Sequence, residues 1–363
     1  MRGGKIGFGF VGTGMAGGIH ARELRFVKGA ELVAVCSRDE ANLNSFAETF
    51  GVKQKYTDYR KLIDSPGVDV VSVLAPTGLH REVALYASRA GKHLIIEKPL
   101  DINLERADDI IRECRKNDTK LAVIFQMRFG DVAQHLKNVV QSGAMGRIFL
   151  ADAFDKSSRT AAYYHSAAWR GTRELEGGGC LMTQSIHIVD LLQYIVGPVR
   201  SVVSKMSTMA HDIEVEDTAV ALLQFECGAM GVLESTTSIR PALKSNVQLH
   251  GENGTIVANA QYDQIMFWNV KGIDPPSPVP ANLELGDIDD PWAYPQTRHR
   301  IQMQDMVDAI RENRQPILGG IEARASLAIN MAIYESARTG REIFLSSPPF
   351  AVPIENQVTT VNP

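Results

Sequence analysis

A glycine-rich turn near the N-terminus has the spacing of a phosphate-binding motif. It lies between the apolar run Lys5–Val11 and a helical pattern, and it reads Gly12-Thr13-Gly14-Met15-Ala16-Gly17. In such a turn the first glycine permits a tight bend, the second allows close approach of a pyrophosphate, and the third lets the helix pack on the strand. The free N–H groups at the helix N-terminus then bind the phosphates. We therefore expect these six residues to bind a dinucleotide.

The residues after the second predicted strand bear on which dinucleotide binds. Ser37-Arg38 stands where an acidic residue would hold the ribose 2′-hydroxyl of NAD, and Asp39 comes one or two positions late. A hydroxyl and a guanidinium are suited to the 2′-phosphate of NADP. The sequence therefore favours NADP and leaves NAD open. Alternatively, Arg38 stacks on adenine or faces solvent.

A lysine follows the apolar strand His93–Ile96 in the motif Glu97-Lys98-Pro99. Ligands of open α/β sheets bind beyond the carboxyl ends of the strands, and a proline restricts the residue before it, so Lys98 should point toward a nicotinamide. There it could shuttle a proton; an exposed surface lysine is the alternative. Other strand ends supply further candidate cofactor contacts, namely Pro76, Thr77, His80, Glu97 and Gln126. Of these, His80 could instead only cap the next helix.

A second glycine run, Gly177–Gly179, opens a helix predicted over Cys180–Val196. On this helix Thr183, His187 and Asp190 are spaced i, i+4 and i+7, so all three should lie on one face. A polar stripe on a helix that is entered through three glycines suggests close approach to a ligand. The alternative is a histidine whose hydrogen bonds are satisfied inside the domain core.

Together these motifs resemble the glucose–fructose oxidoreductase/inositol dehydrogenase/rhizopine catabolism family of NAD(P)-dependent oxidoreductases. The resemblance spans nearly the whole chain and also includes His20, Trp169-Arg170-Gly171 and a closing Tyr334-Glu335-Ser336-Ala337 with Gly340. It implies an N-terminal Rossmann domain and a C-terminal α/β domain with an open antiparallel sheet. Since that sheet commonly mediates oligomerisation in the family, we expect a homodimer or homotetramer that forms through it.

The resemblance also implies roles for single residues. Lys98 and His187 would be the catalytic pair: His187 accepts the proton of a secondary sugar hydroxyl, and Lys98 hydrogen-bonds the developing oxyanion. Trp169 and Arg170 would border the nicotinamide. Members that resemble inositol dehydrogenase carry an aspartate four residues before the histidine, where this chain has Thr183. An inositol dehydrogenase is therefore the second interpretation.

A small polar residue at position 183 looks more like the branch of the family that oxidises C3 of sugar nucleotides or glycosides. Arg159, Tyr163 and Tyr164 would then bind a carboxylate or phosphate and stack on a pyranose, or they are ordinary loop residues. The predicted substrate contacts are Lys98, Arg159, Tyr163, Tyr164, Thr183, His187 and His299. Two other activities occur on this scaffold: an NAD-dependent glycosidase, and a non-catalytic cofactor-sensing regulator, against which the presence of both Lys98 and His187 argues.

The pattern of apolar runs predicts the elements that hold these residues. From Lys5 to about Gln126, short apolar runs alternate with helical segments, which predicts a doubly wound parallel sheet buried on both faces. After Asp131, strand-like runs without crossover helices predict a mostly antiparallel sheet in an α+β domain. We expect a dinucleotide-binding Rossmann domain over 1–130, a substrate-binding and oligomerisation domain over 131–347, and a tail over 348–363.

Composition narrows the class of protein. With 363 residues, of which 44% are hydrophobic, the chain is long enough for two domains and is no disulfide-stapled scaffold. A net charge of -4 argues against a nucleic-acid partner. The four cysteines form no C-x-x-C pair, and no metal site is predicted. No stretch approaches the roughly 18 apolar residues of a membrane span, so we expect a cytoplasmic protein.

Overall fold

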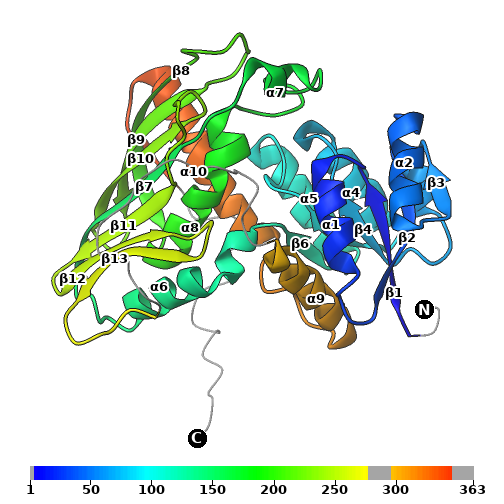
Figure 1. Ribbon diagram of the computed structural model, residues 1–363, viewed down its shortest axis with the longest axis horizontal. Helices are drawn as coiled ribbons and strands as arrows, with labels where there is room; N and C mark the ends of the chain where they lie inside the picture. Colours follow the sequence, from blue (N-terminus) through cyan, green and yellow to red (C-terminus); the bar gives the residue numbers. More distant parts are fainter. Residues whose placement is uncertain (1–3, 277–295, 346–363) are drawn as a thin grey trace, which may run out of the picture.

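The computed structural model describes residues 4–276 and 296–345, and these form two β-sheets flanked by helices (Figure 1). The smaller sheet lies in the N-terminal half of the chain and the larger one in the C-terminal half. The tail predicted over 348–363 lies outside the described residues. In the part of the chain that the structure describes, no helix is long and apolar enough to cross a membrane.

The N-terminal sheet is the predicted doubly wound parallel sheet. Its six strands follow the order β3-β2-β1-β4-β5-β6, and they are β1 (Ile6–Val11), β2 (Ala30–Cys36), β3 (Gln54–Tyr56), β4 (Val70–Val73), β5 (His93–Ile96) and β6 (Leu121–Val123). The connecting helices are α1 (Met15–Leu24), α2 (Glu40–Phe50), α3 (Tyr59–Ile63), α4 (His80–Arg89) and α5 (Leu104–Lys116). Every residue of β1 is buried. The strand order reverses between β1 and β4, and this is where open α/β sheets bind ligands.

The C-terminal sheet has eight strands in the order β13-β12-β11-β7-β10-β9-β8-β14. They are β7 (Ile148–Lys156), β8 (Val199–Ser207), β9 (Thr218–Phe225), β10 (Met230–Thr236), β11 (Asn246–Gly251), β12 (Gly254–Asn259), β13 (Gln264–Val270) and β14 (Ile343–Phe344). Among the described strands β7 and β10 pair in parallel, whereas the other neighbours are antiparallel. The predicted mostly antiparallel sheet is confirmed.

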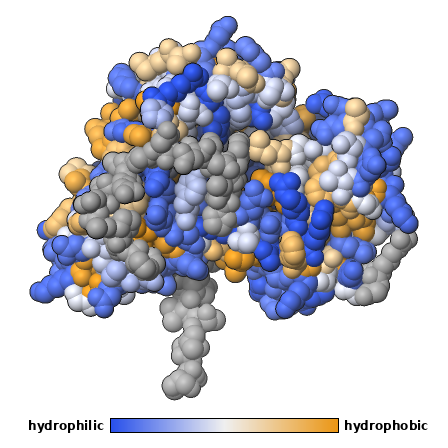
Figure 2. All heavy atoms as spheres, in the orientation of Figure 1, coloured by the Kyte–Doolittle hydropathy of each residue, from blue (hydrophilic) through white to orange (hydrophobic). Residues whose placement is uncertain are grey.

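The two faces of this larger sheet differ. One face packs on α6 (Asp131–Gln141), α8 (Ile186–Val196) and α10 (Gly320–Thr339) in a single apolar core. The other face leaves large apolar side chains in solvent: Val203, Val220, Leu222 and Met230 are each at least 42% exposed. Figure 2 shows apolar side chains along the left of the molecule, where this sheet lies. In β9 buried and exposed residues alternate, and the exposed positions of such a strand are ordinarily polar. Here Val220 and Leu222 occupy two of them.

The last helices tie the two halves together. Helix α9 (Thr297–Arg311) contacts α1 and contributes Met303, Met306 and Val307 to the core that contains Phe8 and Phe10 of β1. Helix α10 contacts both α5 of the first half and β8 of the second. The chain after residue 296 therefore returns to the N-terminal sheet, although its sequence follows the second sheet.

Candidate active site

A cleft of about 990 Å³ runs along the carboxyl ends of the N-terminal strands and is closed on its other side by parts of the segment 159–187. It is lined by nearly all residues predicted to bind the cofactor, namely Gly12, Thr13, Gly14, Met15, Ala16, Ser37, Arg38, Pro76, Thr77, His80, Glu97, Lys98, Gln126, Trp169 and Arg170. Of the predicted cofactor residues, Gly17 alone does not line the cleft. The structure thus brings these residues together, while their contact with a cofactor stays a prediction.

The glycine-rich turn has the geometry that a phosphate-binding turn needs. Gly12 has φ +121°, and a Cβ on it would lie 2.4 Å from the carbonyl oxygen of Leu74. A Cβ on Gly17 would lie 2.7 Å from the carbonyl oxygen of Gly12, whereas one on Gly14 would meet nothing within 4 Å. The first and third glycines therefore serve close packing of the chain on itself. The second leaves open space in front of the N-terminus of α1.

Two buried polar atoms of this cleft support a dinucleotide as its ligand. The hydroxyl of Thr13 and the amide oxygen of Gln126 are buried and have no hydrogen-bond partner among the described residues. Unpaired buried polar groups are costly, so both atoms need a ligand or water to bond. Both line the cleft, one at the glycine-rich turn and the other beyond β6. The residues present therefore fit a long ligand with polar groups along its length.

The structure explains why Asp39 is a poor candidate for the ribose of NAD. Its carboxylate accepts the backbone N–H of Asn42 at 3.1 Å and caps the N-terminus of α2. Capping of this kind stabilises a helix by about 1 kcal/mol. Ser37 and Arg38 precede it and line the same end of the cleft. Their contact with the adenosine ribose stays a prediction.

His80 lies at the edge of the cleft but is bonded to the backbone. Its Nε2 is 3.0 Å from the carbonyl oxygen of Ala75, and its Nδ1 is 3.1 Å from that of Pro99. The side chain is buried. His80 therefore braces the ends of β4 and β5, because whichever ring nitrogen carries the proton can donate it to a backbone carbonyl.

Lys98 connects the two walls of the cleft. Its Nζ donates a hydrogen bond of 2.6 Å to the backbone carbonyl of Thr183, which belongs to a π-helical turn, Leu181–Ser185, just before α8. Such turns interrupt α-helices and are frequent at functional sites. Burial lowers the pKa of the Lys98 ammonium, while the carboxyl groups of Glu97 and Glu176 oppose that shift. A lysine in this state is a competent proton donor.

His187 lies one turn beyond Thr183 and lines the same cleft. Its ring packs edge-on against Phe125, with 6.0 Å between ring centroids, and its Nδ1 is buried without a hydrogen-bond partner among the described residues. Burial, and secondarily the charge of Lys98, lowers the pKa of His187 well below its usual value. The imidazole is therefore neutral near neutral pH and able to accept a proton.

The three polar residues predicted to share one face of the helix after Gly177–Gly179 do not all face the cleft. Thr183 and His187 face the cleft, but Asp190 accepts two hydrogen bonds from Arg128, at 2.7 and 2.6 Å, and one from Ser326. The π-helical turn shifts the spacing, and the buried arginine fixes the aspartate elsewhere. Asp190 is therefore a structural residue.

The glycines that precede this helix do not approach a ligand, contrary to the expectation from sequence. A Cβ on Gly178 would lie 2.0 Å from the hydroxyl of Tyr334, and one on Gly179 would lie 1.6 Å from the carbonyl oxygen of Glu216. The carboxylate of Glu216 accepts the N–H groups of Gly179 and Leu181. Gly178 and Gly179 are glycines because other parts of the protein pack so closely against them that a side chain would not fit.

A second cavity of about 210 Å³ lies behind His187. Five residues line both cavities and form the junction between them: Met127, Arg159, Gln184, His187 and Gln261. Several polar side chains line the second cavity, among them Asp155, Ser157, Ser245 and Asn246, together with apolar ones such as Ile188 and Leu191. Sequence reasoning missed Met127 and Gln261, because neither belongs to a motif. The cavity suits a ligand that is rich in hydroxyl groups.

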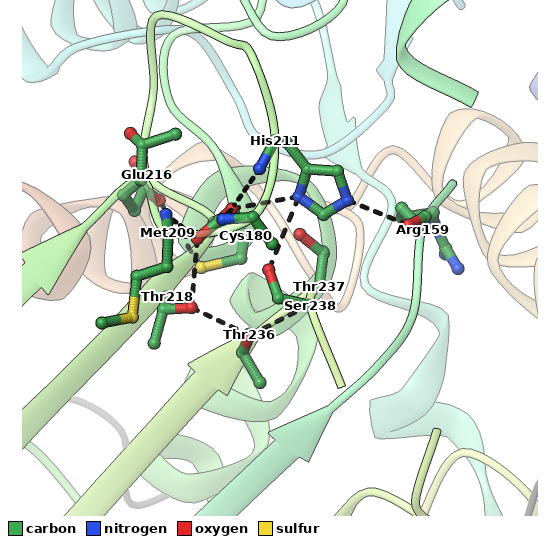
Figure 3. Close-up of polar contacts among 12 residues, drawn as sticks. Arg159, Cys180, Met209, His211, Glu216, Thr218, Thr236, Thr237 and Ser238 are labelled. Carbon is green, nitrogen blue, oxygen red and sulfur yellow. Dashed lines mark hydrogen bonds and ion pairs between the residues drawn. The ribbon is translucent and has the colours of Figure 1, made fainter. Parts of the chain in front are cut away.

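Arg159 lies at this junction, where hydrogen bonds hold both its guanidinium and its backbone. Its Nη2 donates to the amide oxygen of Gln184 at 2.6 Å, while its backbone N–H donates to the carbonyl of Thr237 at 2.8 Å. Figure 3 shows the His211 ring pointing at the Arg159 backbone on one side, where its Nε2 lies 3.0 Å from the carbonyl oxygen. The other ring nitrogen is 3.0 Å from the carboxylate of Asp217. These contacts fix the guanidinium at the junction.

The two neighbouring tyrosines have different places. Tyr163 lines the main cleft, and the Arg170 guanidinium stacks over its ring at 4.1 Å from the centroid. Tyr164 was predicted to bind substrate, but its hydroxyl is 2.9 Å from that of Thr237 and its buried ring packs against His211. It lines neither cavity. The structure thus assigns Tyr164 to the support of the loop.

His299, whose contact with substrate stays a prediction, lines the cleft and also belongs to a cluster beside Lys98. Its ring packs against that of His20, whose Nε2 lies 3.0 Å from the carboxylate of Glu97. Burial, and then His20, lowers the pKa of His299 to about 4. Ligand atoms of the three residues lie within 4.8 Å of one another, as a metal site also requires, but the hydrogen bond already joins two of them. Glu97 and His299 line the cleft, whereas His20 does not.

Comparison with known proteins agrees with this geometry. Residues 6–125 match a family model described as "Oxidoreductase family, NAD-binding Rossmann fold", and residues 133–257 match one described as "GFO/IDH/MocA C-terminal domain". The myo-inositol 2-dehydrogenase of Thermotoga maritima is 27% identical over 95% of this chain and 98% of that protein.

Two solved structures are similar over most of their length. The WlbA dehydrogenase of Bordetella pertussis, in complex with NADH and UDP-GlcNAcA, is 30% identical, with a TM-score of 0.83 over 94% of this chain and 99% of that one. The WlbA enzyme of Chromobactrium violaceum, with the same ligands, is 29% identical, with a TM-score of 0.84 over 95% of this chain and 97% of that one.

Proposed function

Because the chain belongs to the GFO/IDH/MocA family of NAD(P)-dependent oxidoreductases, we propose that it transfers a hydride between a nicotinamide and a secondary hydroxyl or ketone of a sugar derivative. One observation carries this proposal. Lys98 of the first half donates to the Thr183 carbonyl of the second and so stands beside His187, inside the cleft that the glycine-rich turn opens. A proton-transfer pair next to a dinucleotide site is what a dehydrogenase of alcohols needs.

When bound, the nicotinamide supplies the hydride acceptor for oxidation. His187, neutral because of its lowered pKa, accepts the proton of the substrate hydroxyl. Lys98 donates a hydrogen bond to the oxygen as negative charge develops on it. Trp169 and Arg170, which form part of the opposite wall, exclude water from that end of the cleft. In the reverse direction His187 returns that one proton to the oxygen, while Lys98 again hydrogen-bonds the oxygen.

A sugar nucleotide oxidised at C3 is the substrate class that we favour. Thr183 replaces the aspartate expected of inositol dehydrogenases, and Arg159 stands at the entrance to the polar second cavity, where it suits a carboxylate or phosphate. Two similar structures hold UDP-GlcNAcA. The similarity to a myo-inositol 2-dehydrogenase keeps a cyclitol as the second candidate.

For the cofactor we favour NADP, with NAD as the alternative. Arg38 and Ser37, which line the cleft after β2, support this choice, as does the capping of α2 by Asp39. Against this, the similar WlbA structures hold NADH. Residues 1–130 would bind the dinucleotide, and residues 131–347 would bind the sugar.

We also propose a homodimer or homotetramer that forms through the outer face of the larger sheet. Val203, Val220, Leu222 and Met230 would form the centre of the contact, since exposed apolar patches of this kind mark interaction surfaces. Sedimentation of the wild-type protein, and of a variant with Leu222→Lys, tests this. A wild-type protein that sediments as a monomer would contradict the assembly.

The experiment that tests the activity is a screen for nicotinamide reduction, with NAD⁺ and NADP⁺ separately, across UDP-linked sugar acids, inositols, hexoses and glycosides. We expect reduction with the UDP-linked sugar acid and none with His187→Ala. Cleavage of an aryl glycoside without accumulation of reduced nicotinamide would instead indicate a glycosidase. Tight cofactor binding without turnover of any substrate would indicate a regulator.

A further inference from the structure

Glu97 is a carboxylate held in a fixed position inside the cleft. One of its oxygens accepts a hydrogen bond of 3.0 Å from His20 Nε2, and the other accepts the backbone N–H of Lys98 at 3.2 Å. The His20 side chain is completely buried, whereas that of Glu97 is 14% exposed and lines the cleft. The carboxylate is thus anchored from behind and open to the ligand in front.

The charge of Glu97 is permanent at working pH. Although burial alone would raise its pKa, the hydrogen bond and charge of His20, together with His299 and Lys98, lower the pKa to about 2. The other carboxyl group near Lys98 behaves differently, because burial raises the pKa of Glu176 to about 7. Of these two carboxyl groups, only Glu97 stays fully ionised.

The place of Glu97 follows from its neighbours. It precedes Lys98 directly in the chain, and His299 and His187 line the same part of the cleft. Lys98 and His187 must flank the carbon that gives up the hydride, so the nicotinamide ring must come to this end. This step depends on the function proposed above. The ring carries a positive charge when oxidised and none when reduced.

We propose that the Glu97 carboxylate makes the cleft discriminate between the two redox states of the cofactor, by binding the oxidised form more tightly than it would without this charge. The Glu97 side chain is only 14% exposed, so its charge is screened less than a charge at the surface and acts more strongly on a cation nearby. Differential affinity for two states shifts the equilibrium between them. The bound couple is therefore a stronger reductant than it would be without the Glu97 charge.

The test compares Glu97→Gln with Glu97→Asp by calorimetric titration of the oxidised and reduced cofactor, without substrate. Glutamine keeps the size and the acceptor for His20 but removes the charge. We expect the dissociation constant of the oxidised cofactor to rise about tenfold and that of the reduced cofactor by less than about twofold. With aspartate, which keeps the charge, the ratio of the two constants should stay within about twofold of the wild-type ratio.

Glu82→Gln is the matched control, because Glu82 lines the same cleft beside Tyr59, away from Lys98. It should change both constants by the same factor. Equal changes in both constants for Glu97→Gln, with dehydrogenase activity present in the wild-type protein, would overturn this inference alone. A wild-type protein that binds neither redox state would overturn it together with the proposed function.

Discussion

The two walls of the cleft are built in different ways. The N-terminal wall consists of strand ends and exposed backbone, so its ligand-facing shape comes from Gly12, Gly14 and the residues that follow β2, β4 and β5. The C-terminal wall consists of side chains that other side chains hold, as His211 and Gln184 hold Arg159. A wall of strand ends and exposed backbone suits a dinucleotide, which many proteins bind. The second wall suits a ligand particular to this protein.

The two glycine runs show the same contrast. At Gly14 the missing Cβ leaves open space for a ligand, whereas at Gly178 and Gly179 it leaves room for Tyr334 and Glu216. A glycine run therefore signals close approach without saying what approaches. The following predictions test this division between a cofactor wall and a substrate wall.

The largest effect is expected where one residue of each wall meets the reacting carbon. Lys98→Ala and His187→Ala should each lower kcat by about 10²-fold or more, because a positioned proton-transfer group is lost. Affinity for the reduced cofactor, measured by fluorescence titration, should change by less than about threefold. If both variants retained near-wild-type turnover, the catalytic pair would be misassigned.

Alanine at the two glycine runs should separate folding from binding. Gly179→Ala places a Cβ 1.6 Å from a carbonyl oxygen, so the free energy of unfolding should fall by about 3 kcal/mol in urea titrations. Gly14→Ala meets no atom within 4 Å and should leave stability within about 0.5 kcal/mol while weakening the cofactor about tenfold. A stability loss for Gly14→Ala as large as that for Gly179→Ala would contradict the proposed difference between the two glycine runs.

Arg159 tests the substrate wall. Arg159→Ala should raise KM for a UDP-linked sugar acid about tenfold or more, because charge-assisted hydrogen bonds are lost, with a smaller change in kcat. KM for a neutral cyclitol is the internal control and should hardly move. An equal rise for both substrates would show that Arg159 supports the loop and does not bind the anion.

Arg38 tests the choice of cofactor by the first wall. Arg38→Ala should weaken NADP binding about tenfold and NAD binding by less than about twofold, since only NADP carries the 2′-phosphate. Arg60→Ala, which removes another arginine of the same cleft, should affect both cofactors alike. Equal losses for Arg38→Ala would mean that this residue does not bind the 2′-phosphate.

The smallest effect concerns Glu176, which lies at the seam of the two walls and accepts the N–H of Gly171. Its pKa is raised from 4.5 to about 7, mainly by burial, so the folded protein holds this proton more tightly than the unfolded chain. The resulting stabilisation is present below pH 4.5 and is lost as the pH rises toward 7. Glu176→Gln should therefore flatten the pH dependence of unfolding by about 2 kcal/mol between about pH 5 and pH 8. An unchanged slope would contradict the burial argument.

The first wall was largely predictable from the sequence, and the reason is local. A parallel strand, a glycine turn and a helix follow one another within a few residues, so the positions of Gly12 to Ala16 and of Lys98 followed from chain order. The edge strands β3 and β14 were missed because they have only three and two residues, and their pairing depends on the neighbouring strand.

The second wall was predicted less well because long-range contacts decide it. That Tyr164 is turned away depends on Thr237, and that Asp190 is a structural residue depends on Arg128 and Ser326. Nothing near Gln261 or Glu176 marks them as cleft residues. Likewise, the amphipathic pattern of α9 does not reveal that it packs on the first sheet.

The most direct test of the central claim is to follow a single hydrogen atom. UDP-GlcNAcA labelled with deuterium at C3 is incubated with the enzyme and the oxidised cofactor, and the nicotinamide is examined by mass spectrometry. We predict that the deuterium appears on the reduced nicotinamide with the wild-type enzyme and that His187→Ala abolishes the transfer. Reduced nicotinamide that carries no deuterium, or transfer that persists at the wild-type rate in His187→Ala, would contradict the account.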